Sequence, residues 1–405
     1  MIRSRAAVPM ADDAHREQTS TMTPTTEISG TYDPAFRSVF DTFVEHFVRH
    51  PKNGLPELGA AVCIEVDGRR VVDLWAGWAD VARTRAWTPD TLACVCSCTK
   101  GMTAIAVHRL AERGLLDYDE PVAAYWPEFA AAGKSGVTVR HLLTHAAGLN
   151  RLREPLTAGG IFDWTTVTDA LAAEEPFWEP GTAHGYHTLS FGHLNGEVVR
   201  RIDGRDIGRF FRDEIAGPLG ADFFIGTPAS EDHRVAELAL PHKGSMLAKV
   251  AHQAVGIDPM SIERYDDPSI LTPPILNSIP WRRAQIPGAN GFATARGMAR
   301  IYGALVNDEG VLRPETVALA RTPQVHGLDR THGAVNEFGL GFATSGTPTS
   351  YRPGSNGFGH GGAYGSLGHA DPDARLSFGF VFNQLGEPQG DGRAARLLDA
   401  ALDAI

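Results

Sequence analysis

Apolar residues recur along the chain at two different spacings, and each spacing predicts a different element. Residues 34–50 carry apolar side chains at helical spacing, which indicates a helix with one buried face. The runs 59–66 and 70–77 have the apolar pattern of strands. The turn sequence Asp67–Arg69 lies between them, so we expect an antiparallel hairpin.

Helical patterns dominate the middle of the chain, and strand patterns return near its end. Within Cys94–Gly101 a strand-like run gives way to a buried helix, which is expected to end near Gly114. Further helices are expected at 165–174, 190–202, 293–306 and 392–405, and further strands at 337–344, 366–372 and 375–384. Between the helices, residues 226–289 form a long, proline-rich stretch that follows neither period.

This order of elements predicts a mixed α/β (α+β) fold. Strands at both ends favour one antiparallel sheet built from both termini and flanked by helices, with a mostly helical domain inserted. The α/β domain would be discontinuous, formed by 31–98 and 290–405, and the helical domain would span 99–289. The long loop 226–289 would wall a cleft, although a surface excursion without function fits that loop equally well. Residues 1–30 are polar and are expected to be a disordered tail.

Composition narrows the class of protein. The chain has 405 residues, 43% of them hydrophobic, and a net charge of −11. An acidic surface disfavours nucleic acid and anionic membranes as partners, because both require a basic face. No apolar run is long enough to cross a membrane, and the first thirty residues lack the apolar core of a signal peptide. We therefore expect a soluble, cytoplasmic protein.

The segment CVCSCTKG raises the question of whether its chemistry belongs to the cysteines or to the serine. Cys94, Cys96 and Cys98 are separated by single residues, whereas zinc ligands are usually separated by two to four. These cysteines are better interpreted as small core residues. His141 and His145 have the spacing of a zinc helix but lack its glutamate. We expect neither a metal nor another cofactor.

Ser97 and Lys100 are three residues apart, so on a helix both side chains would lie on one face. A serine alcohol becomes a strong nucleophile when a neighbouring base removes its proton. Lysine can be that base if burial or nearby positive charge lowers its pKa towards neutrality. A helix N-terminus would also offer backbone N–H groups to a developing oxyanion. By itself the spacing is more typical of an N-cap serine followed by a solvated lysine.

Five segments in order give the pair its context. Ser97–Lys100 resembles the first motif of the serine β-lactamase and penicillin-binding-protein superfamily. Residues 137–149 resemble its Leu-Leu-Thr-His segment, 179–204 the segment of the second motif, 287–305 a segment of the esterase branch, and 358–372 the third motif. The resemblance is closest to the class C-like branch, which includes the family VIII carboxylesterases. An α/β-hydrolase is disfavoured because no serine has glycine two residues before and two residues after it.

The resemblance implies roles for individual residues. Ser97 would be the nucleophile that forms an acyl-enzyme, and Lys100 would share or remove its proton. Tyr186 would be the second acid/base, with a pKa lowered by Lys100 so that the two titrate together. The backbone N–H groups of Ser97 and Ala363 would form the oxyanion hole.

Two departures from the family pattern bear on the substrate. His360-Gly361-Gly362 stands where the third motif has Lys-Thr-Gly, and Thr188 stands where the second has asparagine. The resemblance assigns the three third-motif residues to substrate binding, and Trp281 is expected to wall an acyl pocket, core packing being the alternative. Losing these polar contacts favours uncharged acyl groups over β-lactams.

We therefore expect a serine carboxylesterase for small-molecule esters of short or medium acyl chains. An acyltransferase, or a hydrolase of amides, β-lactams or D-amino-acid peptides, would use the same site. A non-catalytic binding protein on the same fold is a further alternative.

Overall fold

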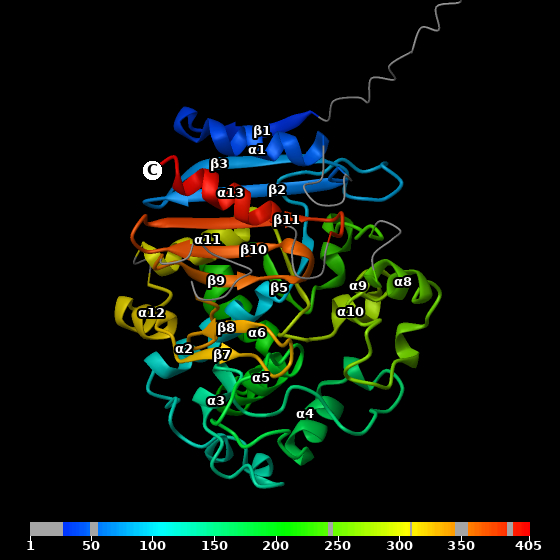
Figure 1. Ribbon diagram of the computed structural model, residues 1–405, viewed down its shortest axis with the longest axis vertical. Coiled ribbons are helices and arrows are strands. Elements are labelled where there is room, and N and C mark those ends of the chain that lie inside the picture. Colours follow the sequence, from blue (N-terminus) through cyan, green and yellow to red (C-terminus); the bar gives the residue numbers. More distant parts are fainter. Residues whose placement is uncertain (1–26, 49–55, 242–245, 308–309, 345–354, 387–391) are drawn as a thin grey trace, which may run out of the picture.

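The computed structural model describes residues 27–48, 56–241, 246–307, 310–344, 355–386 and 392–405. Its largest sheet has six antiparallel strands in the order β1-β3-β2-β11-β10-β9 (Figure 1). Their bounds are β1 (Ile28–Tyr32), β2 (Gly59–Val66), β3 (Arg69–Gly77), β9 (Phe358–Gly361), β10 (Leu367–Asp371) and β11 (Leu376–Phe382). The two halves of the sequence meet where Val62 of β2 pairs with Phe380 of β11. The predicted fold class, a sheet built from both ends of the chain, is thus confirmed.

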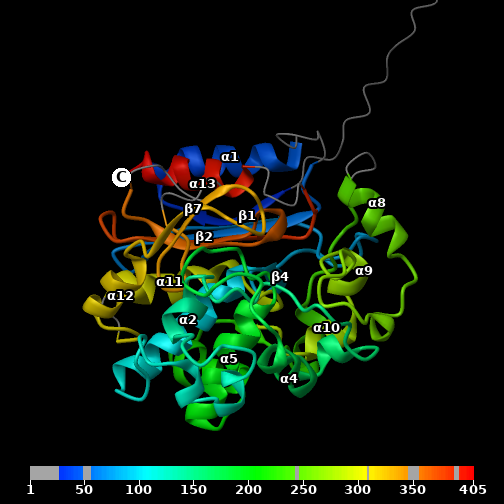
Figure 2. The same ribbon diagram turned by 60° about the horizontal axis from the view of Figure 1, so that its bottom comes forward.

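Helices cover both faces of this sheet. Figure 2 shows α1 (Arg37–Val48) and α13 (Arg393–Leu402) on one face and α11 (Ala295–Val306) on the other. Strands β2 and β11 lie at the centre and are buried over almost their whole length. Burial on both faces explains why their sequences are continuously apolar instead of alternating.

The inserted region surrounds a central helix, α2 (Cys98–Glu112). This helix is buried on nearly every side, which is why its apolar residues do not form a single stripe. Further helices of this region are α3 (Val139–Leu143), α4 (Trp164–Ala173), α5 (Ser190–Asp203), α6 (Ile207–Phe211) and α7 (Gly217–Leu219). Helix α12 (Pro314–Arg321) follows α11 later in the chain. Shorter helical turns are η1 (Pro34–Phe36), η2 (Val122–Ala124), η3 (Pro127–Ala130), η4 (Gly160–Phe162), η5 (Arg212–Ala216) and η8 (Ala363–Gly365). None of the described helices has the length and apolar character needed to cross a membrane.

A three-stranded sheet brings distant segments together beneath the large one. Its order is β4-β6-β5, with β4 (Ala93–Cys96), β6 (Gly291–Ala293) and β5 (Phe223–Ile225). A two-stranded ribbon, β7 (Val325–Leu328) and β8 (Val335–Phe338), lies near the edge strand β9. Because β4 leads directly into α2, the small sheet positions the Ser97 turn beside the start of β6.

Two predictions about individual segments need correction. Residues 28–30, expected in a disordered tail, belong to β1, a polar edge strand held by backbone pairing with β3 that leaves no apolar pattern. Residues 1–26 of that tail lie outside the described part of the chain. The strand expected at 337–344 ends at Phe338, because Gly339–Phe342 form a tight turn.

The proline-rich stretch 226–289 also contains more structure than its sequence suggests. It holds η6 (Ala229–Arg234), α8 (Met246–Gln253), η7 (Pro259–Ser261), α9 (Pro273–Leu276) and α10 (Ile279–Arg283). In η7, α9 and α10 a proline occupies one of the first two positions, where its missing N–H costs nothing. The prolines therefore begin short helices here and do not only break them.

Candidate active site

Ser97 lies in a strained turn between β4 and α2. Cys96, immediately before it, has φ +45°, a left-handed conformation that a non-glycine residue adopts only when its surroundings enforce it. Thr99 provides part of these surroundings, because its hydroxyl donates to the Cys96 carbonyl and accepts the Gly291 N–H at 2.8 Å. The turn is thus fastened to the first residue of β6.

Lys100 is completely buried beneath Ser97. Its Nζ lies 3.1 Å from the Ser97 hydroxyl and 2.7 Å from each of the carbonyl oxygens of Thr188 and Gly288. Burial lowers the pKa of Lys100 to about 7, because the charged ammonium is removed from water. As a neutral amine it can donate one N–H to each carbonyl and direct its lone pair at the serine proton.

Glycine at two positions makes this arrangement possible. A Cβ on Gly192 would lie 2.0 Å from the Gly288 nitrogen, and a Cβ on Gly288 would lie 2.7 Å from the Leu189 carbonyl oxygen. The two backbone segments can approach this closely only without side chains. Their approach brings the carbonyls of Thr188 and Gly288 to the same amine.

Tyr186 completes the group of predicted catalytic side chains. The Lys100 Nζ lies 4.5 Å from the centre of its ring, and Ser97 lies within hydrogen-bonding reach of its phenol. Burial raises the pKa of Tyr186, which differs from the sequence expectation that Lys100 would lower it. Desolvation of the phenolate outweighs the hydrogen bond with Ser97, which favours ionisation, so Tyr186 is a neutral phenol.

The residues that hold Tyr186 were missed in the sequence. A buried carboxylate, Asp329, accepts the Tyr186 N–H at 2.9 Å and the N–H groups of Thr331 and His332 at 2.8 and 2.9 Å. The His145 ring packs 4.8 Å from the Tyr186 ring. Asp329 gives little sequence signal, because an aspartate in a Gly/Thr-rich turn is common.

The histidines around Tyr186 are neutral. His187 accepts the Leu149 N–H at Nε2, so its Nδ1–H donates to the Gly185 carbonyl, and burial lowers its pKa to about 4. His145 accepts the His187 N–H at 3.1 Å, and burial holds its pKa well below the usual range. Within the described ranges, no three His, Cys, Asp or Glu side chains gather in a group that could hold a metal.

The third-motif segment lies against the nucleophile turn. A Cβ on Gly362 would lie 2.2 Å from the Val95 carbonyl oxygen, and the Ser366 hydroxyl donates to that carbonyl at 3.0 Å. Gly361, Gly362 and Ala363 remain partly exposed, as a substrate contact requires. In the described part of the chain, no backbone or side-chain acceptor takes the Ser97 or Ala363 N–H.

His360 differs chemically from the lysine it replaces. Its side chain is 5% exposed, and its Nδ1 lies 2.8 Å from the Gly361 carbonyl. Burial and the nearby Lys100 lower its pKa to about 3, so the imidazole is neutral. The third motif therefore carries no positive charge at this position.

The residue after Ala363 is held from two sides. Tyr364 has φ +74°, its carbonyl accepts Arg393 Nη2 at 3.0 Å, and its hydroxyl donates to the Leu271 carbonyl. Arg393 is itself buried and forms an ion pair with Glu57. The candidate oxyanion turn is thereby tied both to α13 and to the 226–289 stretch.

The expectation for Trp281 needs correction. Its side chain is completely buried and its indole N–H faces Cys94, so it packs in the core, away from any substrate. Cys94, Cys96 and Cys98 are buried and unpaired, which confirms their interpretation as core residues.

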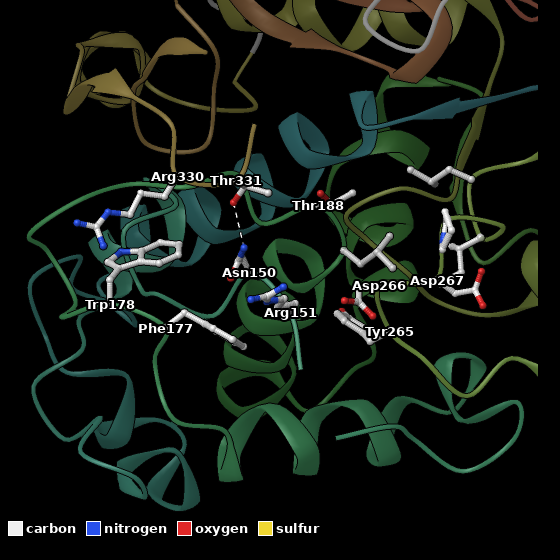
Figure 3. A pocket seen from close by; sticks show the side chains of 14 residues that line it. Asn150, Arg151, Phe177, Trp178, Thr188, Tyr265, Asp266, Asp267, Arg330 and Thr331 are labelled. Atoms are coloured by element: carbon white, nitrogen blue, oxygen red, sulfur yellow. Dashed lines mark hydrogen bonds between the residues drawn. The ribbon is translucent and has the colours of Figure 1, made fainter. Parts of the chain in front are cut away.

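Figure 3 shows the residues that line a cavity of about 580 Å³. Thr188, whose carbonyl accepts from Lys100, belongs to its wall. The lining residues are Asn150, Arg151, Phe177, Trp178, Thr188, Leu189, Tyr265, Asp266, Asp267, Pro268, Ile270, Leu271, Arg330 and Thr331. Six of them belong to the 226–289 stretch, so that stretch forms much of the cavity wall.

Comparison with known proteins places most of the chain in one family. A family model described as Beta-lactamase matches residues 40–403. Esterase/beta-lactamase LipL of Mycobacterium tuberculosis (strain ATCC 25618 / H37Rv) is 37% identical over 377 residues, covering 89% of this chain and 84% of LipL.

Solved structures agree over the same length. A family VIII carboxylesterase superposes with a TM-score of 0.82 at 41% identity, covering 94% of this chain and 100% of that chain. A penicillin-binding protein homolog from Caulobacter crescentus gives a TM-score of 0.81 at 36% identity, with 94% and 100% covered. The resemblance inferred from the motifs is confirmed: the chain belongs to the beta-lactamase family.

Proposed function

We propose that this protein is a serine carboxylesterase that cleaves esters of short and medium acyl chains through an acyl-Ser97 intermediate. One observation carries the proposal: the buried Lys100 amine lies 3.1 Å from the Ser97 hydroxyl with a pKa of about 7. A base with this pKa can accept the serine proton near neutral pH. Two relatives, LipL and the family VIII carboxylesterase, are described as esterases, which supports the same activity.

In the acylation step, neutral Lys100 accepts the Ser97 proton as Oγ attacks the ester carbonyl carbon. The carbonyl oxygen becomes an oxyanion, which the N–H groups of Ser97 and Ala363 stabilise. The bond to the alcohol oxygen then breaks, and the Tyr186 phenol donates its proton to that oxygen. The products are a free alcohol and an ester of Ser97.

In the deacylation step, water attacks the acyl-Ser97 carbonyl. Tyr186, now a phenolate stabilised by the Lys100 ammonium, accepts a proton from the water. The Ser97–acyl bond breaks, Oγ recovers its proton from Lys100, and the carboxylic acid leaves. Over the cycle, one ester and one water give one acid and one alcohol.

Two features favour esters over β-lactams. The neutral His360 imidazole supplies no cation for a carboxylate placed beside the scissile bond. Thr188 directs its carbonyl at Lys100 and carries no side-chain amide. Because LipL is described as an esterase and a β-lactamase, weak lactam hydrolysis is the second candidate activity, and transfer of the acyl group to an alcohol is the third.

Labelling and turnover test the proposal together. The wild-type protein is expected to react with a fluorophosphonate probe, to carry the adduct on Ser97 by mass spectrometry, and to hydrolyse ethyl butyrate. Ser97→Ala should lose both properties while keeping its melting temperature. Ester hydrolysis that survives this substitution would refute the mechanism, and a dominant new ester product with added alcohol would make the protein an acyltransferase.

A further inference from the structure

Two arginines line the cavity without carboxylate partners. Arg151 and Arg330 are both exposed, and Figure 3 shows Arg330 beside Trp178 and Arg151 nearer the middle of the view. The Arg151 guanidinium lies 4.6 Å from the centre of the Phe177 ring, and that of Arg330 lies 5.9 Å from the Trp178 ring. No carboxylate of the described residues lies within ion-pairing distance of either guanidinium.

The acidic residues of the cavity are already engaged. Asp266 lies 3.0 Å from the Arg264 guanidinium, and the Asp267 carboxylate accepts the Ser269 N–H at 2.8 Å. Figure 3 shows both aspartates on the side away from Trp178 and Arg330. The cavity therefore offers two unneutralised cations, while its carboxylates have partners of their own.

The arginine side of the cavity is joined directly to the catalytic group. Arg330 donates its backbone N–H to the His184 carbonyl at 3.0 Å, and its neighbour Asp329 accepts the Tyr186 N–H. A Cβ on Gly185 would lie 2.7 Å from the Trp178 ring and 3.2 Å from Arg330 Cβ, so this turn packs tightly on the cavity wall. A ligand that touches Arg330 would therefore extend from the neighbourhood of Tyr186.

We propose that this cavity binds a carboxylate at the far end of the ester substrate, held by Arg151 and Arg330. The inference rests on the proposed function and narrows its substrate class. A guanidinium presents its N–H groups in a planar fork that matches a carboxylate, and such charge-assisted hydrogen bonds are stronger than neutral ones. Stacking on Phe177 and Trp178 orients the two forks before a ligand arrives.

The rest of the wall fits an aliphatic spacer between the two ends of the substrate. Leu189, Ile270 and Leu271 line the cavity, and a volume of about 580 Å³ accommodates a chain of several carbons. The charge would lie away from the scissile bond, where the neutral His360 stands. A substrate can therefore be uncharged at the scissile bond, as the third motif predicts, and still carry a carboxylate at its far end.

Matched ester pairs test this specificity. Monoethyl adipate and ethyl hexanoate differ only in a terminal carboxylate on the acyl side, and the butyryl ester of ω-hydroxyhexanoic acid and hexyl butyrate differ in the same way on the alcohol side. We expect the wild type to show a kcat/KM about tenfold higher for the charged member of one pair, because a charge-assisted hydrogen bond is stronger than a neutral one. The pair that shows this preference identifies the side that carries the carboxylate.

Variants assign the preference to the arginines. Arg151→Met and Arg330→Met should each reduce the charged-to-neutral ratio about fivefold to tenfold, Arg→Lys should restore part of it, and added salt should weaken it because both cations are exposed. Arg153→Met is the matched control, since Arg153 also stacks on Phe177, at 3.9 Å, but is paired with Glu174.

The possible outcomes separate this inference from the proposed function. A wild-type ratio near one in both pairs, or a ratio unchanged in both methionine variants, would overturn the carboxylate site while Ser97-dependent hydrolysis of neutral esters stood. A ratio that falls equally in Arg153→Met would also overturn it, because the effect would then be structural. Failure to cleave any of the four esters would overturn both proposals.

Discussion

Among the residues whose burial the structure describes, two lysines are completely buried, and only one of them lies in the candidate active site. Lys100 in α2 and Lys134, after η3, both have side chains with no exposed surface. Each amine has three oxygen partners, and burial lowers the pKa of Lys100 to about 7 and of Lys134 to about 8. Burial and an unusual pKa therefore do not distinguish a catalytic lysine from a structural one.

The difference lies in the oxygens that the amines face. The Lys134 Nζ donates to the carbonyls of Ala131, Ala172 and Glu174, and the latter two end the helix α4. An amine there caps the helix and satisfies carbonyls that lack intrahelical partners. Lys100 has one hydroxyl among its partners, Ser97, and a hydroxyl has a proton to give. Reactivity therefore depends on whether one of the oxygen partners of the amine carries a proton that it can give up.

Replacing each lysine by methionine gives the strongest contrast. Both substitutions keep the side-chain volume and remove donors from buried carbonyls. Lys100→Met should lower kcat/KM for ethyl butyrate about 10³-fold, because it removes the general base. Lys134→Met should change it by less than about twofold, because only helix capping is lost. Similar losses in both variants, measured with purified folded protein, would show that the effect of Lys100 is structural.

The phenol of Tyr186 should matter only where a proton must be delivered. Tyr186→Phe should lower kcat/KM for ethyl butyrate about 10²–10³-fold, since an alkoxide is a poor leaving group without protonation. For p-nitrophenyl butyrate the loss at acylation should be smaller, because p-nitrophenolate leaves without a proton. Steady-state and burst kinetics on the two esters would check this, and equal losses would contradict the assigned role.

The pH dependence of activity should report the Lys100 amine. Because the base must be unprotonated, kcat/KM should rise about tenfold per pH unit below pH about 7 and level off above it. Lys134→Met should leave this profile in place. Measuring kcat/KM between pH 5.5 and 9, with the Ser97→Ala rate subtracted, tests this dependence. A flat profile across that range would exclude Lys100 as the base.

Both lysines should contribute to the pH dependence of the unfolding free energy, and this is the smallest of the expected effects. The lowered pKa values mean that the unfolded chain binds more protons than the folded protein between about pH 8 and pH 10, so each lysine makes stability rise with pH there. Lys134→Met should reduce the slope of the unfolding free energy by up to about 1.4 kcal/mol per pH unit relative to the wild type. Urea titrations at several pH values test this, and identical slopes would contradict it.

The candidate catalytic side chains could be predicted from motifs in the sequence, whereas the backbone groups that position them could not. The spacing of Ser97 and Lys100 indicated a candidate pair, and the resemblance of five segments to the superfamily implied roles for both and for Tyr186. The carbonyls of Thr188 and Gly288 that hold the amine could not, since every residue has a carbonyl and only the fold directs it. The raised pKa of Tyr186 likewise depends on packing around the ring.

The same limit applies to the fold. Buried strands such as β2 and β11 leave continuous apolar runs and were predicted, whereas β1 is polar and is defined by its pairing with β3. Trp281 shows the opposite error, because a large aromatic beside a motif fits a pocket wall and a core equally well in sequence.

The bond from Arg393 to the Tyr364 carbonyl has a consequence for how the protein becomes active. Ser97 is synthesised well before Arg393, so a nascent chain that lacks α13 contains the candidate nucleophile without the contact that holds the candidate oxyanion turn. Hydrolysis would begin only once α13 has docked on the sheet. An enzyme truncated just before this helix should still contain Ser97, Lys100 and Tyr186, and should nevertheless be inert.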